Sequence, residues 1–511
     1  MKLRLHGGQA DTGRFVEIEI NAAGRGAIHQ DEFGLAPLYI ATEMGFSFVA
    51  NQSDLIAQAI HRFLGKPPQR DRAFSALLTF RGFPMGDRTG FRGIRAVPFR
   101  AHVQVGSRVT LIPPSSQHPW VPLAPESSDL VNRAVDELEN SAAATIRHAA
   151  RTAAGRRPRL ELTGGRDSRL VLALAIRSGA VDRFEAVTYT GRADDVRIAG
   201  EVAQSARVHS LAEDRPPVTD DPFERVGTTS GALSLSEACR AWRDPPATVL
   251  TGFFGESLSS HFPFAAPPRT RGSVLAAFIE RPNLDLLTEP AWIEVVATTM
   301  QLLMEPLAHG ANIEDVLDAF YIQHRIRRWF SVRPEAFRDT VFPLYCPAAV
   351  RLAFAMGWQG RTEHPIHDAL VERAGRGIAG HSYASAKRTG KPSPGTMGYP
   401  EAGPPILDMD SLRRIAGAWR GRRPRFALPN AAANPDPNRE GAALAARHAS
   451  PAKLDLYRDI AADAQNPAFE VIDRPRLLAT LDVLPILPSN LAKQVYAAMT
   501  SVIWLGEMET T

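Results

Sequence analysis

The chain has 511 residues, of which 44% are apolar and 22% charged, and its formal net charge is +4. At roughly 100–200 residues per domain, this length predicts two or three domains and excludes a single small module. The longest apolar runs, such as residues 170–176, fall far short of the roughly 18 residues that cross a bilayer, and the net charge is too small to indicate nucleic-acid binding. The first residues contain no apolar segment typical of a secretory signal, so we expect a cytoplasmic protein whose partners include neither membrane nor nucleic acid.

Cysteine and lysine are both scarce. The two cysteines, Cys239 and Cys346, are too few and too far apart for a disulfide framework or a cysteine-rich zinc site. Only six of the 59 basic residues are lysines, and two of these, Lys387 and Lys391, lie within five residues of each other. Because the chain otherwise uses arginine, this pair of lysines indicates a position where a compact ammonium group is needed.

The sequence pattern of the first 110 residues predicts a β-rich half of the molecule. Short alternating runs predict strands over residues 15–20, 38–41, 46–50, 93–97 and 101–105. Met44 and Gly45 form a predicted turn, and Ser53 is the predicted N-cap of a helix over residues 54–63. Residues 113–128 are rich in Pro and Ser and lack periodicity, so we place a domain linker there.

The second half alternates between helical and strand-like segments. Ser128 is the predicted N-cap of a helix that runs to about residue 150. After it come predicted strands over 159–163, 184–189 and 247–251 and predicted helices over 168–178 and 195–206. This alternation predicts a parallel sheet with crossover helices. The remainder is mostly helical by pattern, including 274–279, 313–329 and 491–505, and the Pro-, Gly- and Asn-rich segment 421–441 is interpreted as a mobile loop.

The most informative motif is the segment 163–168, which lies between a predicted strand and a predicted helix. Gly164 and Gly165 lack Cβ atoms, so successive backbone N–H groups can point at one anion, and the helix N-terminus adds partial positive charge. Thr163 and Ser168 supply hydroxyl groups. The segment lacks the lysine of a Walker motif and the three-glycine spacing of a dinucleotide fold, so it predicts a phosphate cradle of another type.

Asp167 lies inside this predicted cradle. A carboxylate there would repel phosphate unless a divalent cation lay between them, and Mg²⁺ commonly binds carboxylate together with phosphate oxygens. The alternative interpretation is an ordinary strand-to-helix turn in which Asp167 and Ser168 only cap the helix.

The motif resembles the Ser-Gly-Gly-x-Asp-Ser pyrophosphate loop of ATP pyrophosphatases. The wider layout resembles the asparagine synthetase family, which includes β-lactam synthetases and lasso-peptide macrolactam cyclases. Further segments carry the resemblance in the same order along nearly the whole chain: 31–39 with 48–51, 89–94, 195–199 with 208–209, 250–256, and 342–346.

The resemblance implies a two-domain α/β protein. Residues 1–118 would form a degenerate glutaminase-like (Ntn-type) β-rich sandwich domain, and residues 119–128 the linker. Residues 129–511 would form an asparagine-synthetase-like domain, which is a parallel α/β adenine-nucleotide α-hydrolase-like fold with extra helices.

The resemblance also implies roles for individual residues. The pyrophosphate portion of ATP would be held by the loop residues Thr163, Gly164, Gly165, Asp167 and Ser168. Asp167 and Glu256 would share Mg²⁺, with Glu256 also counted as catalytic; the alternative for Glu256 is a solvated loop carboxylate. The family's catalytic lysine maps to Lys391, with Lys387 in reserve, since an ammonium group can neutralise charge that develops on an acyl-adenylate. The alternative for either lysine is a solvated loop residue.

Two departures from the family bear on the substrate. Ammonia-producing members carry a cysteine after the initiator methionine, but this chain has Lys2, so glutamine hydrolysis by that route is unavailable and the nitrogen is expected from an amine on the substrate. Phe253 stands where relatives carry a polar residue linked to catalysis, and a phenyl ring cannot accept a proton. The base would then be another acid, with Glu237, Asp285 and Glu289 as candidates, or the amine would lose its proton to the adenylate or to water.

These residues favour an ATP- and Mg²⁺-dependent, AMP-forming carbon–nitrogen ligase. The first hypothesis is a lasso-peptide-type macrolactam cyclase of natural product biosynthesis, which joins the N-terminal amine of a precursor peptide to an Asp or Glu side chain. The alternatives are a β-lactam-synthetase-like cyclase of a small molecule or another amine-dependent amide ligase and, from a different class, a non-catalytic scaffold that binds nucleotide or peptide. The expected partners are the precursor peptide or small-molecule substrate, with a leader peptidase or leader-binding protein as a further candidate.

Overall fold

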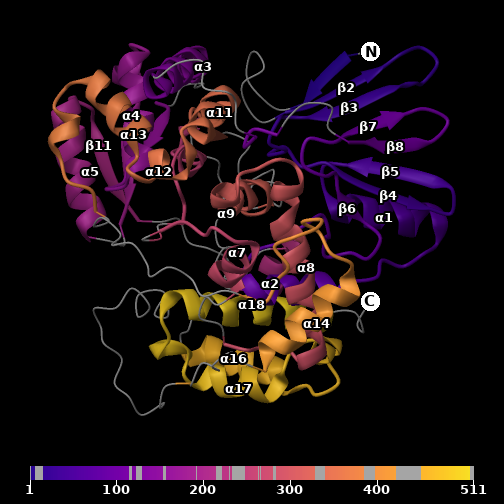
Figure 1. Cartoon of the computed structure of the whole chain (residues 1–511). Helices are drawn as coiled ribbons and strands as arrows, with labels where there is room; N and C mark the ends of the chain where they lie inside the picture. The colour runs from indigo at the N-terminus through magenta and orange to yellow at the C-terminus, as the bar shows by residue number, and fades with distance from the viewer. Residues whose placement is uncertain are drawn as a thin grey trace.

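The computed structural model of the protein describes residues 2–5, 15–113, 118–121, 129–152, 157–190, 193–214, 221–229, 231–232, 248–262, 264, 266–279, 284–328, 340–384, 397–421, 428 and 451–506. The fold is mixed α/β, with two antiparallel sheets and one parallel sheet. Figure 1 shows the antiparallel sheets on one side, the parallel sheet with its helices on the other, and a layer of C-terminal helices along the bottom. Within the described ranges, no helix is both long and apolar enough to cross a membrane.

The first sheet has the strand order β1-β2-β3-β7-β8, and the second has the order β5-β4-β6. The bounds are β1 Lys2–Leu5, β2 Val16–Ile20, β3 Gly26–Gln30, β4 Tyr39–Glu43, β5 Phe46–Ala50, β6 Arg95–Ala96, β7 His102–Val105 and β8 Val109–Ile112. The predicted strands and the β4–β5 turn are confirmed: Met44 and Gly45 both have positive φ, 49° and 83°. β1, β3 and β8 were not predicted.

Two predicted helix starts differ in the structure. Helix α1 covers Ser53–Leu64, so Ser53 is its first residue and not its N-cap, which is Gln52. Helix α3 covers Leu130–Thr152, and the carboxylate of Asp129 accepts the Asn132 N–H at 3.2 Å. Ser128, the predicted cap, lies outside the described residues.

The parallel sheet confirms the predicted alternation of strands and helices. Its strand order is β11-β10-β9-β12-β13, and every paired strand is parallel. The strands are β9 Arg159–Glu161, β10 Glu185–Tyr189, β11 Ser210–Glu213, β12 Val249–Leu250 and β13 Thr340–Val341, and the helices along this part of the chain include α4 Arg166–Arg177, α5 Ala193–Ala206 and α6 Pro222–Thr228. The chain therefore winds from β9 toward β11 and then restarts on the other side of β9 with β12.

The rest of the described chain is mostly helical, as predicted. The α-helices are α7 Arg271–Ile279, α8 Glu289–Ala308, α9 Val316–Phe320, α11 Pro347–Ala355, α12 Gly357–Thr362, α13 Pro365–Ala374, α14 Met409–Arg420, α16 Pro451–Ala462, α17 Arg474–Asp482 and α18 Ser489–Gly506. The single helix predicted over 313–329 is wrong in detail. A 3₁₀ turn, η3 Ile313–Asp315, precedes α9, and a π-helix, η4 Tyr321–Ile326, follows it. The predicted mobile segment 421–441 lies outside the described residues except for residues 421 and 428.

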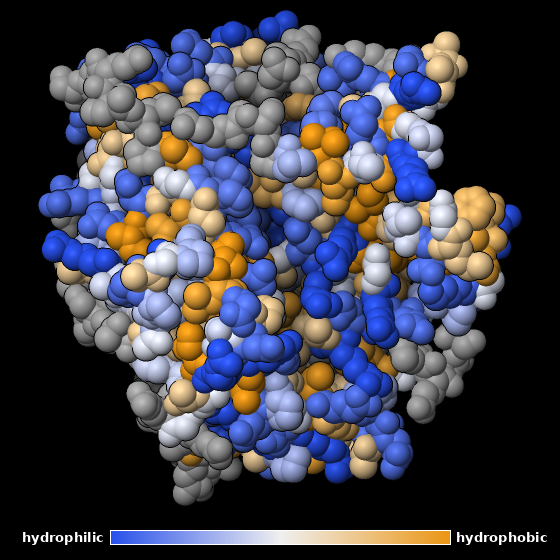
Figure 2. All heavy atoms as spheres, turned by 45° about the vertical axis from the view of Figure 1, so that its right-hand side comes forward, coloured by the Kyte–Doolittle hydropathy of each residue, from blue (hydrophilic) through white to orange (hydrophobic). Residues whose placement is uncertain are grey.

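The two halves share apolar packing. Helix α2, Arg72–Arg81, comes from the β-rich half and packs against α8 and α18 of the helical layer (Figure 1). The indole of Trp504 on α18 lies 5.2 Å from the Phe91 ring and donates its N–H to the Gly90 carbonyl. The face in Figure 2 is largely hydrophilic with separate apolar patches. Large exposed apolar side chains include Met44, Phe46, Leu55 and Phe63, on the β4–β5 hairpin and α1.

Candidate active site

The parallel sheet changes winding direction between its neighbouring strands β9 and β12. In open α/β sheets, ligands bind beyond the carboxyl ends of the strands at such a switch point, because the following loops diverge there and leave a crevice. The loop 162–165 follows β9 and leads into α4, and the loop 251–254 follows β12 and leads into the 3₁₀ turn η2, Gly255–Leu258. The two motif loops predicted from sequence therefore lie side by side.

The glycine loop is organised by its own hydroxyl groups. Ser168 Oγ accepts the Thr163 N–H and lies 3.0 Å from Thr163 Oγ1, which in turn accepts the Gly165 N–H at 3.1 Å. Gly165 is the N-cap of α4 and has no side chain to accept the first-turn N–H groups. These donors and the positive end of a 12-residue helix suit an anion.

The Gly164 N–H, predicted to point at a bound anion, already has a hydrogen-bond partner in the protein. This N–H donates to Asp195 Oδ1 at 3.1 Å, and the Gly164 carbonyl accepts the Ala384 N–H at 2.9 Å. A Cβ atom on Gly164 would lie 2.5 Å from the Ala384 Cβ. The missing side chain therefore admits the segment that ends at Ala384, directly before residues 385–396.

Asp167 lies where the two loops meet. A Cβ atom on Gly252 would lie 2.7 Å from the Asp167 carbonyl carbon, and a Cβ atom on Gly255 would lie 2.5 Å from Asp167 Oδ1. Both glycines thus allow the β12 loop to lie directly on the start of α4. This contact brings Glu256, the residue after Gly255, next to Asp167.

The electrostatics of Glu256 reflect this proximity. Burial of its carboxyl group, followed by the negative charge of Asp167, raises the pKa of Glu256 to about 7, while the positive charge of Arg325 opposes the shift. Two carboxylates that repel one another are stabilised by a cation between them.

Asp167 and Glu256 fit a magnesium site of the substrate-dependent kind. Within the described residues, no group of three or more His, Cys, Asp or Glu side chains forms a complete metal cage. Mg²⁺ usually takes one or two carboxylates and completes its shell with substrate phosphates and water. Gly252 and Gly255 pack directly on Asp167, and this contact places its carboxylate beside Glu256 at this edge of the sheet.

The π-helix η4 forms another side of the site. Arg325, on η4, acts on the Glu256 carboxyl group and stacks over the Phe83 ring at 5.1 Å. Tyr321, at the start of η4, stacks on His261 with 3.7 Å between ring centroids. Neither residue was predicted, because a π-helix rotates side chains away from the faces that an α-helical pattern assigns.

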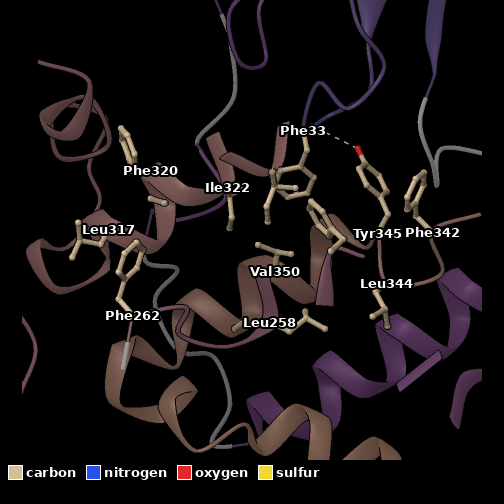
Figure 3. Close-up of a cluster of buried hydrophobic side chains, with 14 of the residues drawn as sticks. Phe33, Leu258, Phe262, Leu317, Phe320, Ile322, Phe342, Leu344, Tyr345 and Val350 are labelled. Carbon is tan, nitrogen blue, oxygen red and sulfur yellow. Dashed lines mark hydrogen bonds between the residues drawn. The ribbon is translucent and has the colours of Figure 1, made fainter. Parts of the chain in front are cut away.

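Phe253 and Phe254 follow Gly252. The partly buried Phe253 ring lies 6.4 Å from Phe342, which follows the neighbouring strand β13. Phe254 is fully buried with φ of 79° and packs against Phe33 and Tyr345 at 4.8 and 5.3 Å between ring centroids. Figure 3 shows Phe33, from the β-rich half, facing Tyr345, whose hydroxyl accepts the Phe33 N–H.

Asp31 fixes the turn that carries Phe33. Its fully buried carboxylate accepts the N–H groups of Phe33, Leu35 and Ala36 and the Tyr345 hydroxyl at 3.0 Å. Burial and the charge of Asp31 raise the pKa of Tyr345 well above its ordinary value, so this hydroxyl stays a donor. The segment 31–39 therefore contacts the half that contains the parallel sheet, at the base of the β12 loop.

The remaining predicted residues are divided between this site, the helical layer and undescribed segments. Lys387, Lys391, Glu237 and Cys239 lie outside the described residues. Asp285 and Glu289 lie in the helical layer, where the adjoining Leu284 and Leu286 hydrogen-bond to Gln494 and Asp473.

Two further residues named in the sequence analysis lie in the described part of the chain. His209, in the segment 208–209 that carries part of the resemblance, is exposed, and its Nδ1 lies 3.1 Å from Glu185 Oε1. Burial raises the pKa of the Cys346 thiol, which makes it a poor nucleophile.

His367 was missed entirely. It lies on α13, 200 residues after Asp167 in sequence, and its Nε2 is 3.1 Å from Asp167 Oδ1. A lone histidine in a helical segment gives no signal of this contact in one sequence.

Comparison with known proteins yields little. No known family matches the sequence, and no curated protein is detectably similar to it. Among solved structures, a glutamine-dependent NAD⁺ synthetase from Acinetobacter baumannii, solved in complex with ADP, is similar over 39% of this chain, with 12% identity and a TM-score of 0.15. The match spans about half, 49%, of that protein's length.

Proposed function

We propose that the chain is an ATP-dependent, AMP- and pyrophosphate-forming amide synthetase. The observation that carries the proposal is the meeting of Asp167 and Glu256 at the sheet's switch point, beside the open N-terminus of α4. Two adjacent carboxylates next to anion-binding N–H groups suit a metal-bound pyrophosphate better than any uncharged ligand.

Different residues of the chain would serve different steps of this reaction. The first turn of α4, with Ser168, would bind the pyrophosphate portion of ATP, and Asp167 and Glu256 would hold Mg²⁺, which supplies positive charge to the departing pyrophosphate. A substrate carboxylate attacks the α-phosphorus, the bond to pyrophosphate breaks, and an acyl-adenylate forms. A substrate amine then attacks the acyl carbon, loses a proton, and expels AMP as the amide bond forms.

The proposed substrate carries both reacting groups. Within the described residues the free cysteine, Cys346, is buried with a raised pKa, which makes it a poor nucleophile for glutamine hydrolysis. Holding amine and acyl-adenylate in one molecule makes amide formation unimolecular, with a large entropic advantage. We therefore favour macrolactam closure of a lasso-type precursor peptide in the cytoplasm, with small-molecule ring closure as the alternative.

The proposal extends to the domains and to two lysines. Residues 1–118 would be the degenerate glutaminase-like domain and residues 129–511 the synthetase domain. The described chain reaches Ala384 against Gly164 and resumes at Met397, and Lys387 and Lys391 lie between these two residues in the sequence. Lys391→Arg and Lys387→Arg preserve charge but not compactness, and the catalytic position is the one whose replacement lowers the rate of amide formation by at least about 100-fold.

A second candidate function, a non-catalytic nucleotide or peptide scaffold, is favoured by Phe253, which removes a polar group from the site. The test is pyrophosphate release from ATP with Mg²⁺ and candidate precursor peptides. Asp167→Ala should abolish release, whereas Asp182→Ala, at an exposed carboxylate in η1, Val181–Arg183, should not. Release of phosphate in place of pyrophosphate, or equal turnover by Asp167→Ala, would reject the adenylation reaction.

A further inference from the structure

The first turn of α13 is attached to the first turn of α4 at two adjacent points. His367 Nε2 lies 3.1 Å from Asp167 Oδ1, and the Asp368 carboxylate lies 3.1 Å from Arg166. The Asp368–Arg166 pair is partly exposed, since 49% of the Asp368 side chain is accessible. The His367 side chain is only 1% exposed. The two contacts therefore differ in kind: one is a surface ion pair and the other a hydrogen bond from a buried imidazole to a partly exposed carboxylate.

The His367 contact fixes one oxygen of Asp167. With a carboxylate acceptor at Nε2, the imidazole donates from that nitrogen. Close to the same oxygen, the Cα of Gly255 leaves no room for even a Cβ atom, which would approach Oδ1 to 2.5 Å and Cγ to 2.7 Å. The carboxyl group contacts both an N–H donor and a close backbone, so its rotation about the Cβ–Cγ bond is restricted. Among the described residues, Oδ2 has no hydrogen-bond partner and can take another ligand.

Simple packing does not account for a histidine here. The other ring nitrogen, Nδ1, is buried and has no hydrogen-bond partner in the part of the chain that the structure describes. A buried polar atom without a partner costs about 1–3 kcal/mol, and an apolar side chain of similar size would avoid that cost. The edge-on contact with His364 at 5.4 Å would equally suit an apolar or aromatic residue. The hydrogen bond to Asp167 is what an apolar residue would lack.

We propose that His367 is a positioning residue that orients Asp167 toward a divalent cation shared with Glu256. This inference rests on the proposed function, since it concerns how the chain prepares its metal ligand. Partners that hold a ligating side chain in place from outside the coordination shell typically contribute 10–100-fold to metal affinity. The restricted carboxyl group would reach the cation without first losing rotational freedom.

The experiment measures Mn²⁺ binding by electron paramagnetic resonance, with ATP present, for the full chain and four variants. His367→Leu fills the space but removes the donor, and we expect about 10–100-fold weaker Mn²⁺ binding. His367→Gln places an amide N–H near the position of Nε2, and we expect binding within about threefold of the unmodified protein. His367→Asn is too short to reach Asp167 and should behave as His367→Leu does.

Two controls separate positioning from folding. Asp368→Asn weakens the other attachment of α13 without touching Asp167, and Mn²⁺ binding should stay within about threefold of that of the unmodified protein. ATP binding in excess chelator should be the same in all variants that fold. If His367→Leu does not fold, the difference between His367→Asn and His367→Gln decides.

Equal Mn²⁺ affinity in His367→Leu or His367→Asn and in the unmodified protein would overturn the inference, as would a loss in His367→Gln as large as that in His367→Asn. Failure of the unmodified protein to bind Mn²⁺ with ATP would instead reject the proposed function, and with it the basis of the inference.

Discussion

Replacing Gly255 by alanine should damage the site while leaving the fold intact. The new Cβ atom would lie 2.5 Å from Asp167 Oδ1 and 2.7 Å from its Cβ and Cγ atoms. Relief to an ordinary contact requires a displacement of about 0.7–0.9 Å, and the Asp167 side chain, which is 40% exposed, can move more easily than the backbone of η2. A misplacement of about 1 Å in a catalytic group can cost 10²-fold in rate. We therefore expect kcat/KM for pyrophosphate release to fall by about 10–100-fold.

Alanine substitutions at two other glycines serve as comparisons for Gly255→Ala. A Cβ atom on Gly252 would meet backbone atoms of Asp167 and Ser168 at 2.7 Å, so Gly252→Ala must move the start of α4 and should lower the free energy of unfolding as well as the rate. A Cβ atom on Gly200, in α5, would have no other atom within 4 Å, so Gly200→Ala should raise stability by about 0.5–1 kcal/mol without affecting the rate. The measurements are urea unfolding and pyrophosphate release. An unchanged rate in Gly255→Ala, with Gly252→Ala likewise unchanged, would refute the assignment of these glycines to the site.

Three further changes test separate contacts. Gly164→Ala should destabilise the glycine loop through the 2.5 Å approach to the Ala384 Cβ, and adding Ala384→Gly should restore at least half of the lost unfolding free energy; a purely additive double mutant would contradict the contact. Arg361→Leu leaves two buried aspartates, 2.8 and 2.9 Å from the guanidinium, without their cation, so urea unfolding should show a loss of about 3–5 kcal/mol; a loss below 1 kcal/mol would be incompatible with this buried network. Burial, followed by the charge of Asp87, raises the pKa of Glu305 to about 7, so the stability that its proton contributes is fully present below about pH 4.5 and is lost as the pH rises to about 7. In Glu305→Gln, the loss of unfolding free energy between about pH 4.5 and pH 7 should be about 2–3 kcal/mol smaller than in the unmodified protein. An unchanged pH profile would contradict the raised pKa of Glu305.

The parallel sheet could be predicted from sequence because its signals are local. Strand-like runs and amphipathic helices alternate over residues 159–251, and the structure contains β9, α4, β10, α5 and β12 there. The short strand β13 could not be predicted, since two residues, Thr340 and Val341, carry no periodicity. The π-helix η4 also escaped prediction, because its sequence has an ordinary helical pattern and only tertiary contacts add the extra residue to the turn.

The candidate site was predictable only where its residues belong to a motif. Asp167 and Glu256 stand in recognisable glycine loops, and the strand order brings these loops together. His367 and Arg325 come from helices with no motif, and their proximity depends on how α13 and η4 pack on the sheet. Packing of that kind is a long-range property of the fold, and a single sequence does not encode it in any local pattern.

The left-handed backbone of Phe254 makes the β-rich half indispensable to its neighbour. A bulky residue with φ of 79° costs on the order of 1–2 kcal/mol, and only surrounding contacts can maintain it. Phe33 supplies one of those contacts from a turn that Asp31 holds rigid. The β-rich half thus supports the conformation of the loop that carries Glu256. Truncation to the half that contains the parallel sheet would remove the Phe33 contact and leave the left-handed backbone of Phe254 without it.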